Sequence, residues 1–317
     1  MNPNTGQFAR PDDSMIRYIE MAGNGASFSF CAVPRDLPGQ LYDLLWKREK
    51  PAILTSGTLA AGGDFTPIRR QMGLCSGAAV QTVQVPSPFD YTRNAMLYFP
   101  PRSSVRDSSK EAQNERVAGQ IERLARSAGG HTLVLFTSYD QMGHVYEKLE
   151  GRLPYPVFKA ARGGQRFVEQ FKQCPNAVLL AGGPCWEGVD FPGDMVSLLV
   201  IVRLPFPVPD PVREARRERY PDLHSYIQAE IVPEMQQKLR QGFGRAIRTE
   251  SDSCAVAILD PRAAPDGRYH RTVLDSLPAG IPIMMETSDI QTFLRAHKSP
   301  DYFLPNHSSR KQKAEER

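Results

Sequence analysis

Four short segments of the sequence carry residue types that could bind or act on a phosphate group. Hydroxyl side chains between a strand and a helix suit phosphate oxygens, because ligands of open α/β sheets sit beyond the carboxyl ends of the strands. Glycines let a backbone approach a phosphate closely, and neighbouring carboxylates can hold a metal-bound water. The four segments are Thr55–Leu59 (TSGTL), Leu135–Tyr139 (LFTSY), Gly182–Asp190 (GGPCWEGVD) and Gln241–Arg248 (QGFGRAIR).

Two of these segments also have a plain structural explanation. Thr137 and Ser138 precede a helix expected from Gln141, so either could serve as its N-cap, a role worth about 1 kcal/mol. Residues 182–190 follow an apolar strand, and their glycines would equally suit a tight turn. The residue types alone leave both explanations open.

The last segment points more directly to phosphate chemistry. Arg245 and Arg248 are three residues apart, which predicts a shared helix face. Two guanidiniums there could act as arginine fingers on a transferring phosphoryl group, and a solvated basic face is the alternative. Gly242 and Gly244 would each weaken the helix by about 1 kcal/mol relative to Ala. Close packing of the backbone beside a nucleotide is one explanation that would offset this cost.

Alternating apolar strands and amphipathic helices must position these segments. Continuous apolar strands are typical of a parallel sheet that is covered on both faces. The sequence therefore predicts an α/β, RecA-like domain with helices on both faces. Its expected strands are 131–136, 155–158, 177–181, 196–202 and 255–259, and its expected helices are 110–127, 141–149, 165–172 and 233–248.

The chain before this domain predicts a smaller α/β piece. A strand is expected at 27–33, a helix at 37–47 and a short buried strand at 52–55, while the first fifteen residues read as a loose tail. The expected divisions are residues 1–75 for the small piece, 76–297 for the large domain and 298–317 for a polar tail.

In this order and spacing, the four segments resemble the XPD/DinG-like branch of the superfamily 2 DNA helicases. Residues 204–211 (LPFPVPDP) and 258–262 (ILDPR) are similar to two further stretches of that family. The resemblance runs from about residue 30 to residue 275. Two departures stand out, because Gly57 replaces a usual Ala and residues 252–254 (DSC) replace a usual D-x-G.

The resemblance implies a role for each segment. It implies that the first motor domain of such a helicase ends in residues 1–75 and that the second motor domain follows. The implied DNA-binding residues are Thr55, Ser56, Thr58, Thr137 and Ser138. The implied nucleotide-binding residues are Gly183, Glu187, Gly188, Asp190 and Gly244. The implied catalytic residues, with the arginines facing the γ-phosphate of ATP, are Gln241, Arg245 and Arg248.

The sequence lacks the other half of an ATP site. A P-loop needs a Gly-Lys pair, the family's Mg²⁺-binding box contains Asp-Glu, and neither dipeptide occurs. The family's cluster-binding cysteines lie between those motifs, so no iron–sulfur cluster is expected in this chain. The resemblance thus predicts the C-terminal segment of an ATP-dependent DNA helicase. It would use ATP, Mg²⁺ and single-stranded DNA with an N-terminal half, and hydrolyse essentially no ATP by itself. The alternative is a non-enzymatic nucleic-acid-binding or regulatory module derived from such a helicase.

Composition fits this interpretation without deciding it. Apolar residues make up 41% of the 317 residues, enough for a sizeable core, and no stretch is long enough to span a bilayer. The net charge of +4 is only mildly basic. Five scattered cysteines and six histidines show no metal-ligand spacing, and reduced thiols fit the cytoplasm. No G-x-S-x-G sequence supports an unrelated α/β hydrolase.

Overall fold

The computed structural model describes residues 13–21, 27–47, 50–60, 63–75, 79–101, 109–161, 164–174, 176–191 and 193–304. The chain divides into two compact units. Residues 1–85 and 206–237 form the smaller unit, and residues 86–205 and 238–317 form the larger one. This division differs from the expected boundaries. After the fifth strand of the larger unit, residues 206–237 belong to the smaller unit, and the chain re-enters the larger unit at residue 238. Among the described residues, no helix is long and apolar enough to cross a bilayer.

A seven-stranded sheet forms the centre of the larger unit, with the order β5-β6-β4-β7-β8-β3-β9. Every neighbouring pair is parallel. The four residues of β3, β4, β6 and β7 are all buried, which is why these strands read as continuous apolar runs. The predicted α/β, RecA-like fold is confirmed. The strands are β3 (Ala95–Tyr98), β4 (Thr132–Leu135), β5 (Val157–Ala160), β6 (Val178–Ala181), β7 (Leu198–Ile201), β8 (Cys254–Ile258) and β9 (Ile283–Met284).

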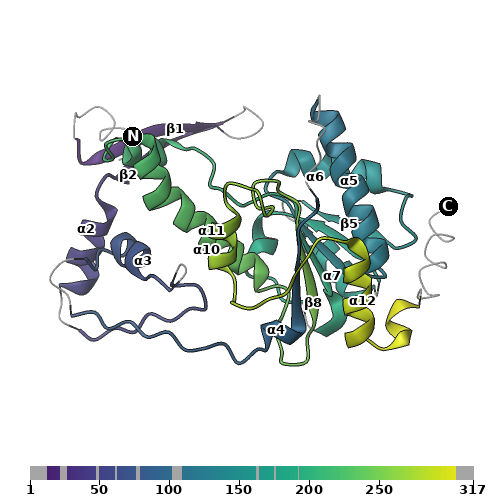
Figure 1. Cartoon of the computed structure of the whole chain (residues 1–317). Helices are drawn as coiled ribbons and strands as arrows, with labels where there is room; N and C mark the ends of the chain where they lie inside the picture. Colours follow the sequence, from purple (N-terminus) through teal and green to yellow (C-terminus); the bar gives the residue numbers. More distant parts are fainter. Residues whose placement is uncertain are drawn as a thin grey trace. The chain divides into compact units, whose positions relative to one another are not determined.

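Helices cover both faces of this sheet (Figure 1). On one face, α5 (Lys110–Ser127), α6 (Tyr139–Leu149) and α12 (Thr287–His297) share one apolar core with alternate strand residues such as Val134 and Val200. On the other face, the end of α10 (Val232–Phe243) reaches Leu135. The larger unit also contains α4 (Tyr91–Asn94), α7 (Gln165–Gln173), α11 (His270–Ser276) and the 3₁₀ turns η2 (Gly183–Trp186), η3 (Gly193–Met195) and η5 (Pro300–Phe303).

Part of the expected polar tail belongs to the folded core. Tyr302, in η5, is buried and stacks on the ring of His131 with 3.9 Å between ring centroids. Its carbonyl also accepts a hydrogen bond from the side-chain amide of Asn176 at 3.3 Å. The prediction that the tail begins at residue 298 is therefore wrong for residues 298–304. The rest of it, residues 305–317, lies outside the described residues.

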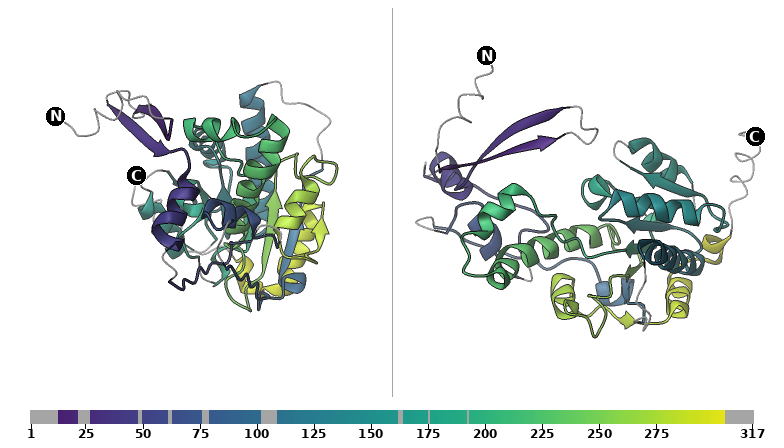
Figure 2. Two further views of the ribbon diagram at one scale, coloured as in Figure 1. Left: turned by 90° about the vertical axis from the view of Figure 1, so that its left-hand side faces the viewer. Right: turned by 90° about the horizontal axis from the view of Figure 1, so that it is seen from above.

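The smaller unit contains a two-stranded antiparallel sheet, seen as a long ribbon in Figure 2. Its second strand and the following helical segment match the predictions. The predicted buried strand at 52–55 is wrong, because these residues are irregular and the Ile53 side chain is 92% exposed. The elements are β1 (Met15–Met21), β2 (Phe28–Pro34), α2 (Leu37–Leu41), the π-helical turn η1 (Tyr42–Trp46), α3 (Thr66–Gln71), α8 (Pro211–Arg217), α9 (Leu223–Tyr226), the π-helical turn η4 (Ile227–Ile231) and the start of α10.

Candidate nucleotide and nucleic-acid site

Two of the predicted segments lie side by side at the carboxyl edge of the large sheet. Leu135 at the end of β4 is in register with Ala181 at the end of β6, so the residues that follow both strands emerge together. Ser138 is the N-cap of α6, and its hydroxyl accepts the backbone N–H of Gln141 at 3.2 Å. Thr137 has no such role and is exposed. The capping explanation therefore holds for Ser138, while Thr137 is open to a ligand.

Tyr139 explains the paired glycines after β6. A Cβ atom at Gly182 would lie 3.3 Å from the Tyr139 ring, and one at Gly183 would collide with the Tyr139 hydroxyl. Gly183 also has a φ of +51°, in the left-handed region that side chains disfavour. The turn η2 therefore favours glycine at residue 183 for its backbone conformation, and at residue 182 a side chain would crowd the Tyr139 ring.

Trp186 ties three of the segments together. Its fully buried indole donates a hydrogen bond from Nε1 to the carbonyl oxygen of Phe136 at 2.9 Å. The backbone of Gly242 lies against its ring, where an added Cβ atom would be 2.8 Å from ring carbons. Close packing explains glycine at residue 242, and the group packed there is the Trp186 indole.

The two predicted catalytic arginines lie beyond the helix. α10 ends at Phe243, and the prediction of a helix to residue 248 with a shared arginine face is wrong. The backbone N–H of Arg245 bonds to Gly242 three residues earlier, which forms a tighter turn. The Asp252 carboxylate then accepts the backbone N–H groups of Arg248 and Thr249, each at 2.8 Å, and stops further helix.

Both guanidiniums nevertheless converge on the loop after β6. Arg245 donates from Nε to the carbonyl oxygen of Trp186 at 3.3 Å and from Nη1 to that of Val189. Arg248 donates to the same Val189 oxygen at 3.1 Å and pairs with Asp190 at 3.3 Å. Burial lowers the pKa of Arg245, and the neighbouring cation Arg248 lowers it further. An arginine stays protonated at neutral pH, so two like charges are held together here.

The remaining predicted nucleotide-binding residues, and Gln241 from the predicted catalytic set, lie in the same two segments as this arginine pair and the loop it contacts. Gly188 has a φ of +79°, so the turn requires glycine, and no atom lies within 4 Å of where its Cβ would be. Gly244 and Glu187 are exposed, and Gln241 is half-buried near the end of α10. The structure therefore brings together the third and fourth segments in one unit, as expected for a shared site.

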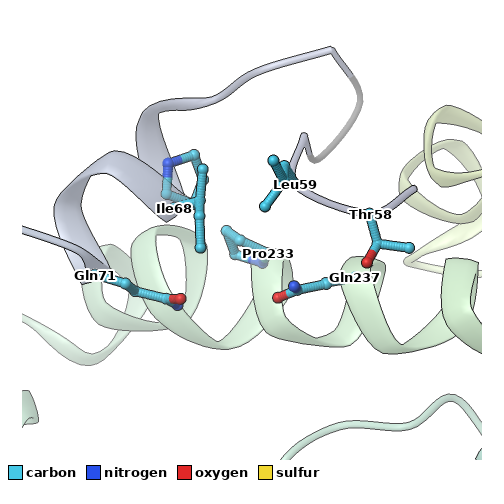
Figure 3. Close-up of a pocket in the computed structure, with 7 residues that line it drawn as sticks. Thr58, Leu59, Ile68, Gln71, Pro233 and Gln237 are labelled. Carbon is cyan, nitrogen blue, oxygen red and sulfur yellow. The ribbon is translucent and has the colours of Figure 1, made fainter. Parts of the chain in front are cut away.

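The predicted DNA-binding residues Thr55, Ser56 and Thr58 belong to the smaller unit. The Ser56 hydroxyl accepts the backbone N–H of Thr58 at 3.2 Å, a local turn that gives both residues a structural role. Thr55 is exposed. Thr58 also lines a small pocket with Leu59, Ile68, Gln71, Pro233 and others, over the start of α10 (Figure 3). Its cavity volume of about 10 Å³ has room for about one water molecule and is far below the roughly 300–1,000 Å³ of typical ligand pockets.

Three residues near these segments have no role that the sequence pattern indicates. Trp186 is one of only two tryptophans, and only the structure places its ring against Gly242. Asp252 stands in a departure from the family pattern, yet its side chain accepts the backbone N–H of Arg248. Arg203 is the single charge in an apolar stretch at 195–204. Among the described residues, no cluster of three His, Cys, Asp or Glu side chains could hold a metal ion.

A family model described as "Helicase C-terminal domain" matches residues 121–280, just over half of the 317 residues. The 3'-5' exonuclease DinG of Bacillus subtilis is 32% identical over 303 residues, covering 92% of this chain and 32% of that protein. The ATP-dependent DNA helicase DinG of Photobacterium profundum is 34% identical over 278 residues, covering 83% of this chain and 39% of that protein. The chain thus spans between a third and two fifths of the length of these curated relatives.

Among solved structures, an apo XPD structure aligns with 61% of this chain and 40% of its own, at 20% identity and a TM-score of 0.46. A Saccharomyces cerevisiae Dbp5 structure bound to RNA and ADP BeF3 aligns with 74% of this chain and 54% of its own, at 14% identity and a TM-score of 0.47.

Proposed function

Because the chain belongs to the helicase C-terminal domain family, we propose that it acts as the C-terminal part of a DinG-type ATP-dependent DNA helicase. Arg245 and Arg248 supply positive charge to an ATP site that is completed by an N-terminal half. That half carries the P-loop and the Asp-Glu box, and the complete site uses ATP with Mg²⁺. The whole assembly acts on single-stranded DNA.

The convergence of Arg245 and Arg248 on one carbonyl oxygen carries this proposal. Two guanidiniums that share the Val189 oxygen repel one another, and Asp190 offsets only part of that charge from an exposed position. Binding of an anion would stabilise such a site, because it relieves the repulsion between the two cations. The γ-phosphate of ATP is the anion that the family membership suggests. Gly188 leaves open space beside the pair for that anion.

The smaller unit supports the need for an N-terminal half. Most of the large apolar side chains that are exposed among the described residues belong to this unit. Ile53 is 92% exposed, Val83 78% and Val85 79%, in segments without regular structure. Exposed apolar surface of this kind marks interaction sites. We infer that residues 1–85 complete the first motor domain when its P-loop part is present.

Steady-state ATP hydrolysis by a reconstituted pair tests the arginine assignment. The chain is combined with an N-terminal DinG segment that carries a P-loop, with single-stranded DNA and Mg²⁺. Arg245→Ala should lower turnover by about 100-fold or more, because removing a transition-state donor costs that much in other enzymes. Arg245→Lys should rescue poorly, since an ammonium group cannot reproduce the planar fork.

Melting curves of the same variants separate catalysis from folding. Arg245 holds two loop carbonyls, so Arg245→Ala should also lower the melting temperature slightly. Arg248→Ala keeps its backbone bond to Asp252 but loses the bond to Val189 and the pair with Asp190, so its melting curve is needed as well. Unchanged turnover in both alanine variants would contradict the arginine assignment, whereas no turnover by a stably formed wild-type pair would favour a non-enzymatic binding module.

A further inference from the structure

At β4 and β7, two neighbouring strands of the large sheet send their connections in opposite directions. β4 and β7 are adjacent, yet the chain from β4 crosses to β5 on one side, and the chain from β7 returns to β8 on the other. The connecting helices agree, since α6 covers one face and the end of α10 covers the opposite face. Ligands of open α/β sheets bind outside the carboxyl ends of the strands at such a switch point.

Thr137 and Arg203 are the residues that this switch point presents. β4 and β7 pair through Leu135 and Ile201, and the backbone N–H of Val202 extends the ladder to the Leu135 oxygen at 3.1 Å. Thr137 and Arg203 each lie two residues beyond that pair in sequence, just past the ends of neighbouring strands. Both are exposed, whereas β4 and β7 themselves are fully buried.

Arg203 has no hydrogen-bond or ion-pair partner within the described ranges. The acidic residue at the end of the next strand is Asp260, and it is already occupied. Arg262 contacts both oxygens of that carboxylate, with Nη2 at 2.7 Å from Oδ2 and Nε at 3.0 Å from Oδ1. The Leu204 backbone N–H bonds to the same group at 2.9 Å. The guanidinium of Arg203 is therefore left without a protein carboxylate at this edge.

We propose that Arg203, together with the Thr137 hydroxyl, binds a backbone phosphodiester of single-stranded DNA at the switch point between β4 and β7. This inference rests on the proposed function and adds a residue to its DNA-binding surface. A phosphodiester carries one negative charge, which one guanidinium balances, and a hydroxyl donates to its second oxygen. A nucleotide triphosphate carries several charges and takes a P-loop lysine and Mg²⁺, neither of which this edge offers.

Fluorescence anisotropy of a labelled oligothymidylate, titrated at several salt concentrations, tests the inference. Arg203→Ala should weaken binding about tenfold at low salt, since hydrogen bonds to charged groups contribute on that scale. It should also make the slope of log affinity against log salt shallower by about 0.7, the value for one phosphate contact on a single strand. Thr137→Val should weaken binding by less and leave the slope unchanged, because no charge is lost.

Arg271→Ala is the matched control, because Arg271 is also exposed but pairs with Asp275 on α11. If Arg203→Ala changes the DNA affinity and its salt slope no more than Arg271→Ala does, and its melting temperature is unchanged, the inference is overturned. Weakened binding of labelled ATP with unchanged DNA binding would instead assign the phosphate to the nucleotide and also overturn it. Wild-type protein that binds DNA without salt dependence would overturn the proposed function itself.

Discussion

Replacement of Gly242 by alanine should destabilise the larger unit, although alanine favours helices. The new Cβ atom would lie 2.8 Å from two ring carbons of Trp186 and 3.3 Å from Cδ1 of Leu135. Trp186 is fully buried and anchored by its bond to the Phe136 carbonyl, so the ring has little freedom to move away. Overpacking of a core costs about 1–3 kcal/mol, and loss of the indole hydrogen bond adds about 0.5–1.5 kcal/mol.

The gain in helix propensity offsets at most about 1 kcal/mol of this cost, because Gly242 is next to last in α10. The expected net loss is about 0.5–3.5 kcal/mol. In a unit of roughly 150–250 residues, that lowers the melting temperature by about 1–14 °C. Thermal unfolding followed by circular dichroism measures this shift.

Gly143→Ala provides the matched control. Gly143 lies in the middle of α6, and no atom is within 4 Å of where its Cβ would be. This variant should gain about 1 kcal/mol and raise the melting temperature by about 2–4 °C. In a Trp186→Phe background, which removes the crowded ring atoms, Gly242→Ala should cost less. Equal stabilisation by both glycine substitutions would refute the packing argument.

Three further perturbations follow from the same structure. Asp252→Ala removes the acceptor of two backbone N–H groups and should lower the free energy of unfolding by about 2–3 kcal/mol. Urea unfolding measures this loss, and an unchanged midpoint would contradict it. Burial favours neutral Asp260, but hydrogen bonds from Arg262 and a backbone N–H hold its pKa below the usual range. The unfolded state then binds more protons, so the stability advantage of wild type over Asp260→Asn should shrink as pH falls below about 4. Burial raises the pKa of Cys254 to about 12, so a thiol reagent at pH 8 should label exposed Cys75 first and Cys254 only on unfolding.

The sequence predicted five of the seven strands of the large sheet and missed β3 and β9, because burial on both faces leaves a local signal mainly in the longer apolar runs. The runs at 132–135 and 198–201 are apolar at nearly every position, and only a parallel sheet between two helix layers removes both faces from water. Helix α5 was predicted at its observed limits because its apolar positions share one face, and the structure adds that Ser109 caps it.

The predictions failed where distant residues decide the local structure. The backbone at residues 248 and 249, where a helix was expected to continue, bonds instead to the Asp252 side chain just before the next strand. Gly242 reads as a weak helix position until the Trp186 ring is placed against it. The run at 52–55 has strand composition, but among the residues described in its unit only β1 and β2 form a sheet. A segment with strand-like residue types does not form a strand where no neighbouring strand is available to pair with it.

The position of Arg203 shows what topology adds to a motif. In the sequence it is one charge in an apolar stretch, with no spacing that marks a site. Its relation to Thr137 depends on the pairing of β4 with β7, strands separated by more than sixty residues of chain. Sheet order is set by packing of the whole unit, so local patterns leave it undetermined.

DNA-stimulated phosphate release tests the central claim most directly, measured for the chain alone and after addition of a P-loop-bearing N-terminal half. The chain alone should release no phosphate above background, because Gly-Lys and Asp-Glu pairs are absent from its sequence. The pair should turn over at rates within the roughly 1–10³ s⁻¹ of typical enzymes and depend on single-stranded DNA. Turnover near 1 s⁻¹ by the chain alone, or none by a stably formed pair, would contradict the account.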